Sequence, residues 1–234
     1  MSLSEKEFAQ SIRRLWQRLD FLQVGEEFSN PASLIPSDEF LRLSLDDKTT
    51  YEELYLCGLA NRDFNLLLSE YSFVQFSRAQ GTLRFAFYPN PLLGASTEAI
   101  SEIAEKKEYV DEGILSLEDY LQEVSELRFP AQKPPIRYEY DPNAYVELRH
   151  PCSHLHVGFH GDNRWAVSRI LTPEAFGLWI SKLYFGSAWQ SAGLFKIGED
   201  DLSAEELLSQ ARQGARVLPD DHFAETERLS FHLS

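Results

Sequence analysis

A segment near the middle of the chain concentrates side chains that can carry out chemistry. Residues 150–160 read HPCSHLHVGFH and hold four of the six histidines. Alternate side chains of an extended strand share a face, so Leu155, Val157 and Phe159 are expected to point together into a core. The opposite face is then predicted to collect the reactive side chains of the segment, namely Cys152, His154, His156 and, if the strand extends that far, His160.

Basic residues lie on both sides of this segment. A strand at 164–170 is expected to pair with it as a hairpin through residues 161–163. Depending on the register, that hairpin would bring Arg164 or Arg169 beside the histidines. The preceding strand adds Arg137. These positions predict a patch where an anionic ligand can dock.

The first interpretation of the histidines is a metal site. Histidines at positions i and i+2 of one strand lie about 7 Å apart and can share Zn²⁺ or a similar divalent ion. His154 and His156 are therefore the candidate metal ligands. Two ligands are not sufficient, and Glu139 or His222 would have to complete the set. The sequence leaves a divalent metal cofactor open.

The second interpretation is metal-free acid–base catalysis on an anion such as a phosphodiester. Imidazole has a pKa near ~6.5, so one histidine can act as the base and another as the acid at neutral pH. An arginine, Arg169 or Arg164, would stabilise the negative charge that develops. This interpretation assigns catalysis to His154, His156 and Arg169, and substrate binding to Arg137, His150 and Arg164.

The third interpretation gives the histidines a structural role, as hydrogen-bond partners of neighbouring strands and loops. H-x-H is found in many unrelated proteins and does not choose among the three. The chain has no G-x-G-x-x-G, P-loop, G-x-S-x-G or C-x-x-C motif. Cys152 lies close to His150 and His154, which makes a thiolate nucleophile a minor alternative.

The distribution of charge narrows the class of partner. A formal net charge of −15 disfavours a protein that coats nucleic acid or anionic membrane indiscriminately. Residues 95–127 carry ten acidic side chains and two lysines, whereas residues 133–170 carry five basic and four acidic ones. The acidic stretch could engage a protein partner. The second stretch could bind an anionic small molecule or nucleic acid.

The start of the chain lacks the basic and then apolar layout of a signal peptide. No apolar run approaches the ~20 residues that span a bilayer, so no membrane association is expected. Cys57 and Cys152 are the two cysteines and are expected to be free thiols. These features predict a cytoplasmic protein.

Local patterns predict an α+β fold, with a largely antiparallel sheet and peripheral helices. Capping boxes at Ser4, Thr50 and Ser203 and an N-cap at Thr172 mark four helices. The helix after Thr172 is expected to bury a stripe formed by Phe176, Trp179, Ile180, Leu183 and Tyr184. Weaker helices are expected at 97–108 and 116–127. Strands are expected at 71–78 and 82–88, which form a hairpin, and at 40–45, 136–140, 145–149, 153–160, 164–170 and 228–233. The chain is predicted to be one domain over residues 1–234, with a minor boundary near 130–135.

Several of these segments together resemble an uncharacterised bacterial family known as a domain of unknown function. The resemblance covers about residues 50–185 and implies that they belong to one domain. It implies no catalytic residues. The segments that carry it are YSFVQF from Tyr71, RFAFYPNP from Arg84, PIRYEYD from Pro135, HPCSHLHVG from His150, and Arg169 followed by LTPEAF from Leu171.

The sequence therefore predicts an enzyme that acts on a phosphorylated or otherwise anionic substrate, with nucleic acid included, through a His/Arg site. Such an enzyme would be a phosphodiesterase or a nuclease. The alternative is a non-catalytic binding or regulatory protein that engages a protein partner through its acidic surface. The two differ in the expected surroundings of the histidines. An enzyme is expected to hold them in a concave, partly solvated pocket with an arginine nearby, whereas in a non-catalytic protein neighbouring side chains are expected to fill that space.

Overall fold

The computed structural model describes residues 3–91, 133–193, 202–230 and 232–233, with scattered positions between 102 and 123. The chain divides into two compact units. One comprises residues 1–89 and 134–234, and the other comprises residues 90–133. Within the smaller unit, Lys106 forms ion pairs with Glu102 and Glu123.

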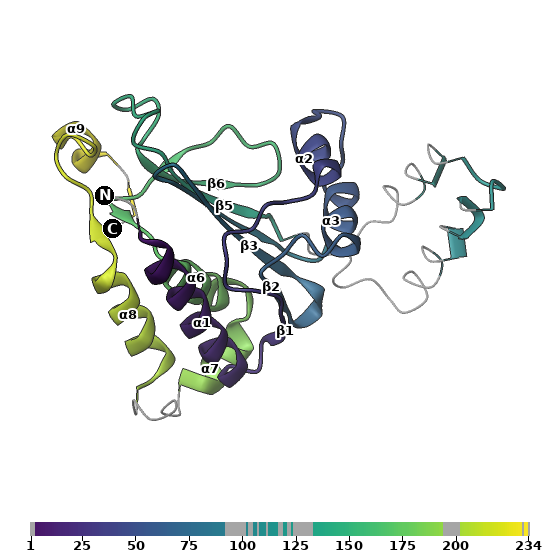
Figure 1. The fold of residues 1–234 in the computed structure, drawn as a ribbon, viewed down its shortest axis with the longest axis horizontal. Helices are drawn as coiled ribbons and strands as arrows, with labels where there is room; N and C mark the ends of the chain where they lie inside the picture. The colour runs from purple at the N-terminus through teal and green to yellow at the C-terminus, as the bar shows by residue number, and fades with distance from the viewer. Residues whose placement is uncertain are drawn as a thin grey trace. The chain divides into compact units, whose positions relative to one another are not determined.

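The larger unit combines a broad antiparallel sheet with helices (Figure 1). Its described helices are α1 (Glu5–Phe21), α2 (Asp38–Leu45), α3 (Tyr51–Ala60), α6 (Pro173–Tyr184), α7 (Gly186–Gly193), α8 (Ala204–Gly214) and α9 (Glu225–Leu229), with a 3-10 turn at Ser69–Tyr71. Its described strands are β1 (Gly25–Phe28), β2 (Leu66–Leu68), β3 (Phe73–Ala79), β4 (Thr82–Tyr88), β5 (Ile136–Tyr140), β6 (Ser153–Val157), β7 (Trp165–Ala166), β8 (Arg169–Ile170) and β9 (Arg216–Val217).

Strands β1 to β7 form one sheet in which spatial order follows chain order. Every neighbouring pair is antiparallel, while β8 and β9 form a separate two-stranded ribbon. The long hairpin of β3 and β4 is the one that the sequence predicts, with Ala79 opposite Thr82 at its turn. The predicted α+β fold with an antiparallel sheet is confirmed.

Helices α1 and α6 pack against one face of the sheet. The Ser4 hydroxyl accepts a hydrogen bond from Glu7 N and the Glu7 carboxylate accepts one from Ser4 N, which forms the predicted capping box. Thr172 caps α6 and Pro173 occupies its first turn. The core on this face comprises Phe8, Ile12, Leu15 and Leu19 of α1, Phe176 and Ile180 of α6, and Phe76, Phe85, Tyr138 and Leu155 of the sheet.

Helices α2 and α3 pack on the opposite face, through a smaller core built from Phe40, Leu54, Tyr55, Phe73, Ala86 and Tyr88. All of the sheet residues in this core belong to β2, β3 and β4. The same face of β5 and β6 carries polar side chains instead of core residues. The sheet is therefore apolar on both faces in its first half but on only one face in its second half.

The structure corrects several element predictions where tertiary contacts or capping override strand-like alternation. Segment 40–45 lies in α2, because the Ser37 side chain caps a helix that starts at Asp38. Segment 145–149 is a turn, closed by a bridge between Val146 and His150. Three further predicted strands differ in the structure. The strand predicted at 153–160 ends at Val157, and the strand predicted at 164–170 is divided into β7 and β8. The segment predicted as a strand at 228–233 begins inside helix α9. The helices predicted at 97–108 and 116–127 fall largely outside the described residues.

Two buried stripes also differ from expectation. On β6, Leu155 is buried as predicted, but Val157 at the strand end is 37% exposed. Phe159 packs with the smaller core on the other face of the sheet. On α6, Ile180 is fully buried, whereas Leu183 is 55% exposed, although the next residue, Tyr184, packs against Phe87.

Within the described residues, no helix combines the length and the apolar character that a membrane span requires.

The contact between α1 and α6 depends on Gly177. A Cβ atom added there would overlap with the side chain of Leu15, which is fully buried in the core. We expect Gly177→Ala to lower the free energy of unfolding by about 1–3 kcal/mol, the usual cost of overpacking. Chemical denaturation measures this, and Leu15→Ala in the same chain should recover part of the overpacking loss.

Gly214→Ala is the matched control, because no atom lies within 4 Å of its added Cβ. This substitution should leave stability unchanged or raise it by up to about 1 kcal/mol, from the better helix propensity of alanine. Equal effects of the two substitutions would contradict the close helix contact.

Candidate functional site

The register of β4, β5 and β6 brings five polar residues together on one face of the sheet. Arg84 of β4 lies opposite Glu139 of β5, and Glu139 lies opposite His154 of β6. Arg137 lies opposite His156 in the same strand pair. These five residues, which we call the histidine face, share the side of the sheet that α2 and α3 cover farther along.

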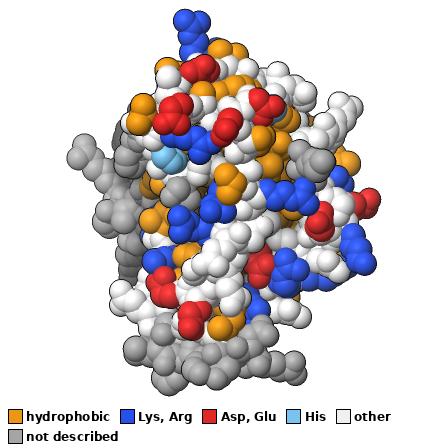
Figure 2. Space-filling view, turned by 90° about the vertical axis from the view of Figure 1, so that its left-hand side faces the viewer, with side chains coloured by type: hydrophobic (Ala, Val, Ile, Leu, Met, Phe, Trp, Pro, Cys, Tyr) orange, Lys and Arg blue, Asp and Glu red, His pale blue; other side chains and the backbone are white. Residues whose placement is uncertain are grey.

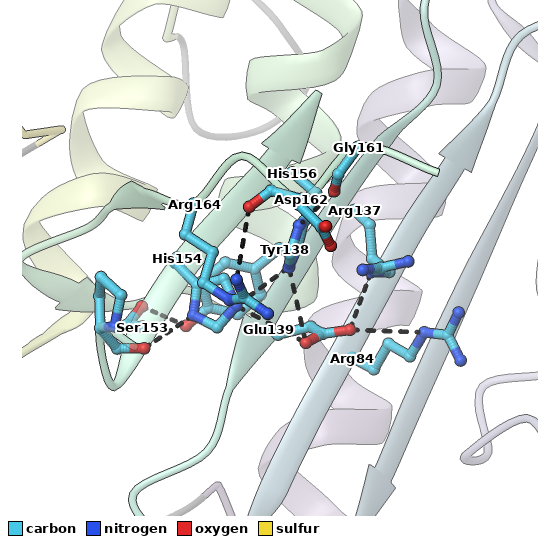
Figure 3. A network of polar contacts seen from close by, with 11 residues as sticks. Arg84, Arg137, Tyr138, Glu139, Ser153, His154, His156, Gly161, Asp162 and Arg164 are labelled. Carbon is cyan, nitrogen blue, oxygen red and sulfur yellow. Dashed lines mark hydrogen bonds and ion pairs between the residues drawn. The ribbon is translucent and has the colours of Figure 1, made fainter. Parts of the chain in front are cut away.

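The two histidines point toward each other from β6, as Figure 3 shows. His154 Nε2 and His156 Nε2 are 3.1 Å apart. The other ring nitrogens contact backbone carbonyls, His154 Nδ1 at 2.7 Å from Pro151 O and His156 Nδ1 at 3.0 Å from Gly161 O. His154 is fully buried and His156 is 3% exposed. Both rings are therefore held in one orientation.

The loop after β6 supplies the carbonyl that holds His156. Gly158 has a φ of +97°, a conformation that favours glycine, and it turns the chain away from the strand. The Asn163 side chain then closes the loop, donating to Val157 O and accepting from Val157 N, both at 2.8 Å. This closure brings Gly161 O back to His156.

Glu139 lies between the histidines and two arginines. Its Oε2 is 3.6 Å from His154 Nε2 and 3.7 Å from His156 Nε2. Its Oε1 is 2.8 Å from Arg137 Nε and 4.0 Å from Arg84 Nε. Burial tends to raise the pKa of this carboxyl, but the interactions with both imidazoles and the charge of Arg137 outweigh it, so the pKa lies well below its usual range. Glu139 is therefore ionised at neutral pH.

The residues that could hold a metal ion are Glu139, His154 and His156. Each offers one ligand atom, and these atoms all lie within 4.8 Å of one another. Of the two residues that the sequence suggested as a third ligand, the structure brings Glu139 to the histidines. His222 instead pairs with Asp221 at 2.9 Å.

His150 lies at the edge of the site, with its ring centre 5.0 Å from that of His154. Its Nδ1 is buried and has no hydrogen-bond partner among the described residues. Burial lowers the pKa of His150, and the charges of His154 and Arg164 lower it further. Arg164 is exposed, and its Nη1 donates to Asp162 O at 3.4 Å.

Two predicted site residues lie elsewhere. The Arg169 guanidinium donates to Ala215 O at 2.9 Å and lines a pocket together with Leu155, on the face opposite the histidines. The continuous strand predicted at 164–170 does not form, because β7 ends at Ala166. Arg169 belongs instead to β8 of the separate ribbon, which explains its position. His160 lies beyond the end of β6, where its Nε2 is 3.2 Å from Thr49 O.

Cys152 does not share the histidine face either. It precedes β6 and is buried in the main core with Leu155 and Tyr140. Burial is the largest cause that raises the pKa of its thiol to about 12, and the charge of Asp141 adds to it. A thiol with this pKa is protonated at neutral pH and is a poor nucleophile.

The comparison with known proteins places the chain in a family. A conserved family described as an uncharacterized conserved protein, DUF2290, matches residues 26–234. The chain belongs to this family. No curated protein and no solved structure matches the chain. The resemblance expected from the sequence is thus confirmed, and it extends beyond residues 50–185 at both ends.

Sequence reasoning did not include Arg84 in the site. The signal was present, since Arg84 is a charged residue within an apolar strand of sequence TLRFAFY. Its relation to Glu139 depends on the pairing of β4 with β5, which no local pattern reveals.

The acidic stretch at 95–127 falls largely outside the described residues. On the face shown in Figure 2, basic and acidic side chains are interspersed.

The contrast between the two cysteines can be tested with a thiol reagent. Cys152 is 1% exposed with a pKa of about 12, whereas Cys57 is only partly buried. We expect one thiol per chain to react with a disulfide reagent at pH 8 in the folded protein, and both thiols to react in denaturant. Cys57→Ser should abolish the reaction of the folded protein. Rapid labelling of Cys152 in the folded state would contradict its buried position.

Proposed function

We propose that this protein is an enzyme that acts on a phosphorylated or otherwise anionic substrate at the histidine face. The observation that carries the proposal is the meeting of two arginines with an ionised carboxylate and a histidine pair. Arg84 and Arg137 both approach Glu139 Oε1, and Glu139 Oε2 faces both Nε2 atoms. A purely structural histidine pair does not need solvent-accessible arginines beside it.

The arginines are suited to bind the substrate anion. The side chains of Arg84 and Arg137 are 40% and 37% exposed, so each has donors free to reach a ligand from solvent. A guanidinium binds phosphate or carboxylate oxygens through a planar set of N–H donors. Arg164, which is exposed at the same end of β6, can add a third cation. This local excess of positive charge favours an anion in a protein whose formal net charge is −15.

A small pocket lies next to the arginines. The pocket has a volume of about 60 Å³ and is bordered by both Arg84 and Arg137. Its remaining lining includes Leu54 and Phe159, which are apolar, and His160. An ester with its anionic group on the arginines could place part of its apolar portion here.

The histidine pair and Glu139 provide the chemistry. In hydrolysis of a phosphate ester, a basic group takes a proton from the attacking water as the new P–O bond forms. The P–O bond to the leaving group breaks, and the protonated base returns the proton to the leaving oxygen, while cations neutralise the charge that develops on the phosphoryl oxygens. The imidazole nitrogens and the Glu139 carboxylate are the basic groups, and Arg84 and Arg137 are the cations. Phosphodiester cleavage is the reaction that we propose to test first.

The test is a turnover assay on chromogenic phosphate monoesters and diesters, nucleotides and single-stranded RNA. We expect hydrolysis of at least one of these by the wild type. We expect His156→Ala to lower the rate by about 10²–10⁴-fold, the usual contribution of a positioned acid or base. Arg137→Ala should raise KM, because it removes an anion-binding group.

Arg169→Ala is the matched control. This arginine lies on the opposite face of the sheet, so its removal should change the turnover rate less than twofold. Failure of the wild type on the whole panel, or equal losses for Arg137→Ala and Arg169→Ala, would contradict the proposal. His156→Ala also leaves Gly161 O without its partner, so its stability should be measured separately and is expected to fall by about 1–3 kcal/mol.

A further inference from the structure

The hydrogen bonds of the two buried imidazoles determine where their protons lie. His154 Nδ1 is 2.7 Å from Pro151 O, and His156 Nδ1 is 3.0 Å from Gly161 O. A carbonyl oxygen can only accept a hydrogen bond, so each Nδ1 carries a hydrogen and donates it. In a neutral ring the lone pair is then on Nε2. Both lone pairs therefore point into the space that the two rings share.

Three acceptor atoms face that space. The two Nε2 atoms are 3.1 Å apart, and Glu139 Oε2 is 3.6 Å from one and 3.7 Å from the other. A proton added to one Nε2 could bridge the two nitrogens, but it would leave the carboxylate oxygen beyond hydrogen-bond distance. A single cation among the three atoms would contact all of them at once.

We propose that His154, His156 and Glu139 bind one divalent transition-metal ion of the zinc class, through His154 Nε2, His156 Nε2 and Glu139 Oε2. The inference concerns the residues of the proposed active site, but it does not depend on the reaction proposed there.

The spacing of the three atoms fits such an ion. With metal–ligand distances of about 2.0–2.1 Å, the separation of the two nitrogens corresponds to an N–metal–N angle of about 100°. The nitrogen–oxygen separations correspond to angles of about 120–130° on the same distances. These angles place the ion close to the plane of the three ligand atoms, in a flattened tetrahedron with three protein ligands. The fourth position is then available to water or substrate, as in catalytic zinc sites.

Partners outside the three ligands hold them in place. The two carbonyls fix the tautomer and the orientation of the imidazoles. Arg137 contacts Glu139 Oε1, which leaves Oε2 directed at the histidines (Figure 3). The Glu139 side chain is 29% exposed whereas the histidine side chains are almost completely buried, so the carboxylate side is the path by which an ion can enter.

The donor set also selects the class of metal. Imidazole nitrogen suits zinc, copper, iron and nickel, whereas magnesium and calcium prefer sites made of oxygen ligands. Two nitrogens and one oxygen therefore favour Zn²⁺, Co²⁺ or Fe²⁺ over Mg²⁺. Cys152 contributes no thiolate, because it lies in the main core.

The experiment uses the full chain, treated with chelator and dialysed. Co²⁺ is titrated and followed by its visible absorption, Zn²⁺ is titrated by calorimetry, and Mg²⁺ serves as the comparison ion. We expect one Zn²⁺ or Co²⁺ per chain and at least a hundredfold preference over Mg²⁺. Glu139→Gln, which keeps the side-chain shape, should weaken Zn²⁺ binding at least tenfold. His156→Ala should abolish binding at this site.

His222→Ala is the matched control, because His222 also lies beside a carboxylate, Asp221, but at a different place on the chain. It should leave stoichiometry and affinity unchanged. Circular dichroism of each metal-free variant establishes that it is folded before titration, and Glu139→Gln carries the test if His156→Ala is not folded. No binding by the folded wild type, or wild-type affinity in folded Glu139→Gln, would overturn the inference.

The outcome is separable from that of the proposed function. Phosphoester hydrolysis that falls in His156→Ala, by a wild type that binds neither Zn²⁺ nor Co²⁺, would overturn the metal and retain the enzyme. Stoichiometric Zn²⁺ binding without turnover of any phosphoester would support the metal and contradict the proposed substrate class.

Discussion

Antiparallel pairing of β5 with β6 places Glu139 directly across from His154 and Arg137 across from His156. Every contact of the histidine face depends on this register. Because side chains alternate along a strand, a shift of one residue would send both histidines into the main core and expose Leu155. The buried neighbours of Leu155, including Tyr138 and Phe176, disfavour that shift. The apolar face of the sheet thus holds the polar face in position.

The two faces of β5 and β6 have opposite requirements. On one face, aromatic residues pack around Phe85, Tyr138 and Phe176, and that contact area stabilises the fold. On the other face, buried imidazoles and a carboxylate need partners, because an unsatisfied buried polar group is costly. A backbone carbonyl accepts from each Nδ1, and Arg137 forms an ion pair with one oxygen of Glu139. The Nε2 atoms and the second oxygen are left facing one another, and the proposed metal site rests on this arrangement.

Helix coverage separates the part of the sheet that serves as core from the part that can serve as a site. Helices α2 and α3 cover the apolar side chains of β3 and β4. On the same face, Arg84, Arg137 and Glu139 keep between 29% and 40% of their side chains exposed. The histidines of the same face are buried. The arginines are therefore the part of the histidine face that solvent reaches most.

Local chemistry was sufficient to predict much of the fold. Capping boxes at Ser4, Thr50 and Ser203 began helices where expected, since a cap and its helix lie within four residues. Period-two alternation likewise predicted that His154 and His156 share a face. Alternation failed where local chemistry competed with it, as at Ser37, whose cap turns a strand-like segment into α2.

The membership of the site could not be predicted in the same way. Arg84, Glu139 and His154 lie far apart in the chain and meet only through the pairing of three strands. Arg169 was expected beside them because hairpin continuity predicts it, yet the chain leaves the sheet after β7 and carries Arg169 to the opposite face. Residue types and alternation along one strand are local properties, and the sequence shows them. The pairing of side chains across strands is the one that gives the whole packed sheet its lowest free energy. This pairing is therefore decided only when the strands are assembled.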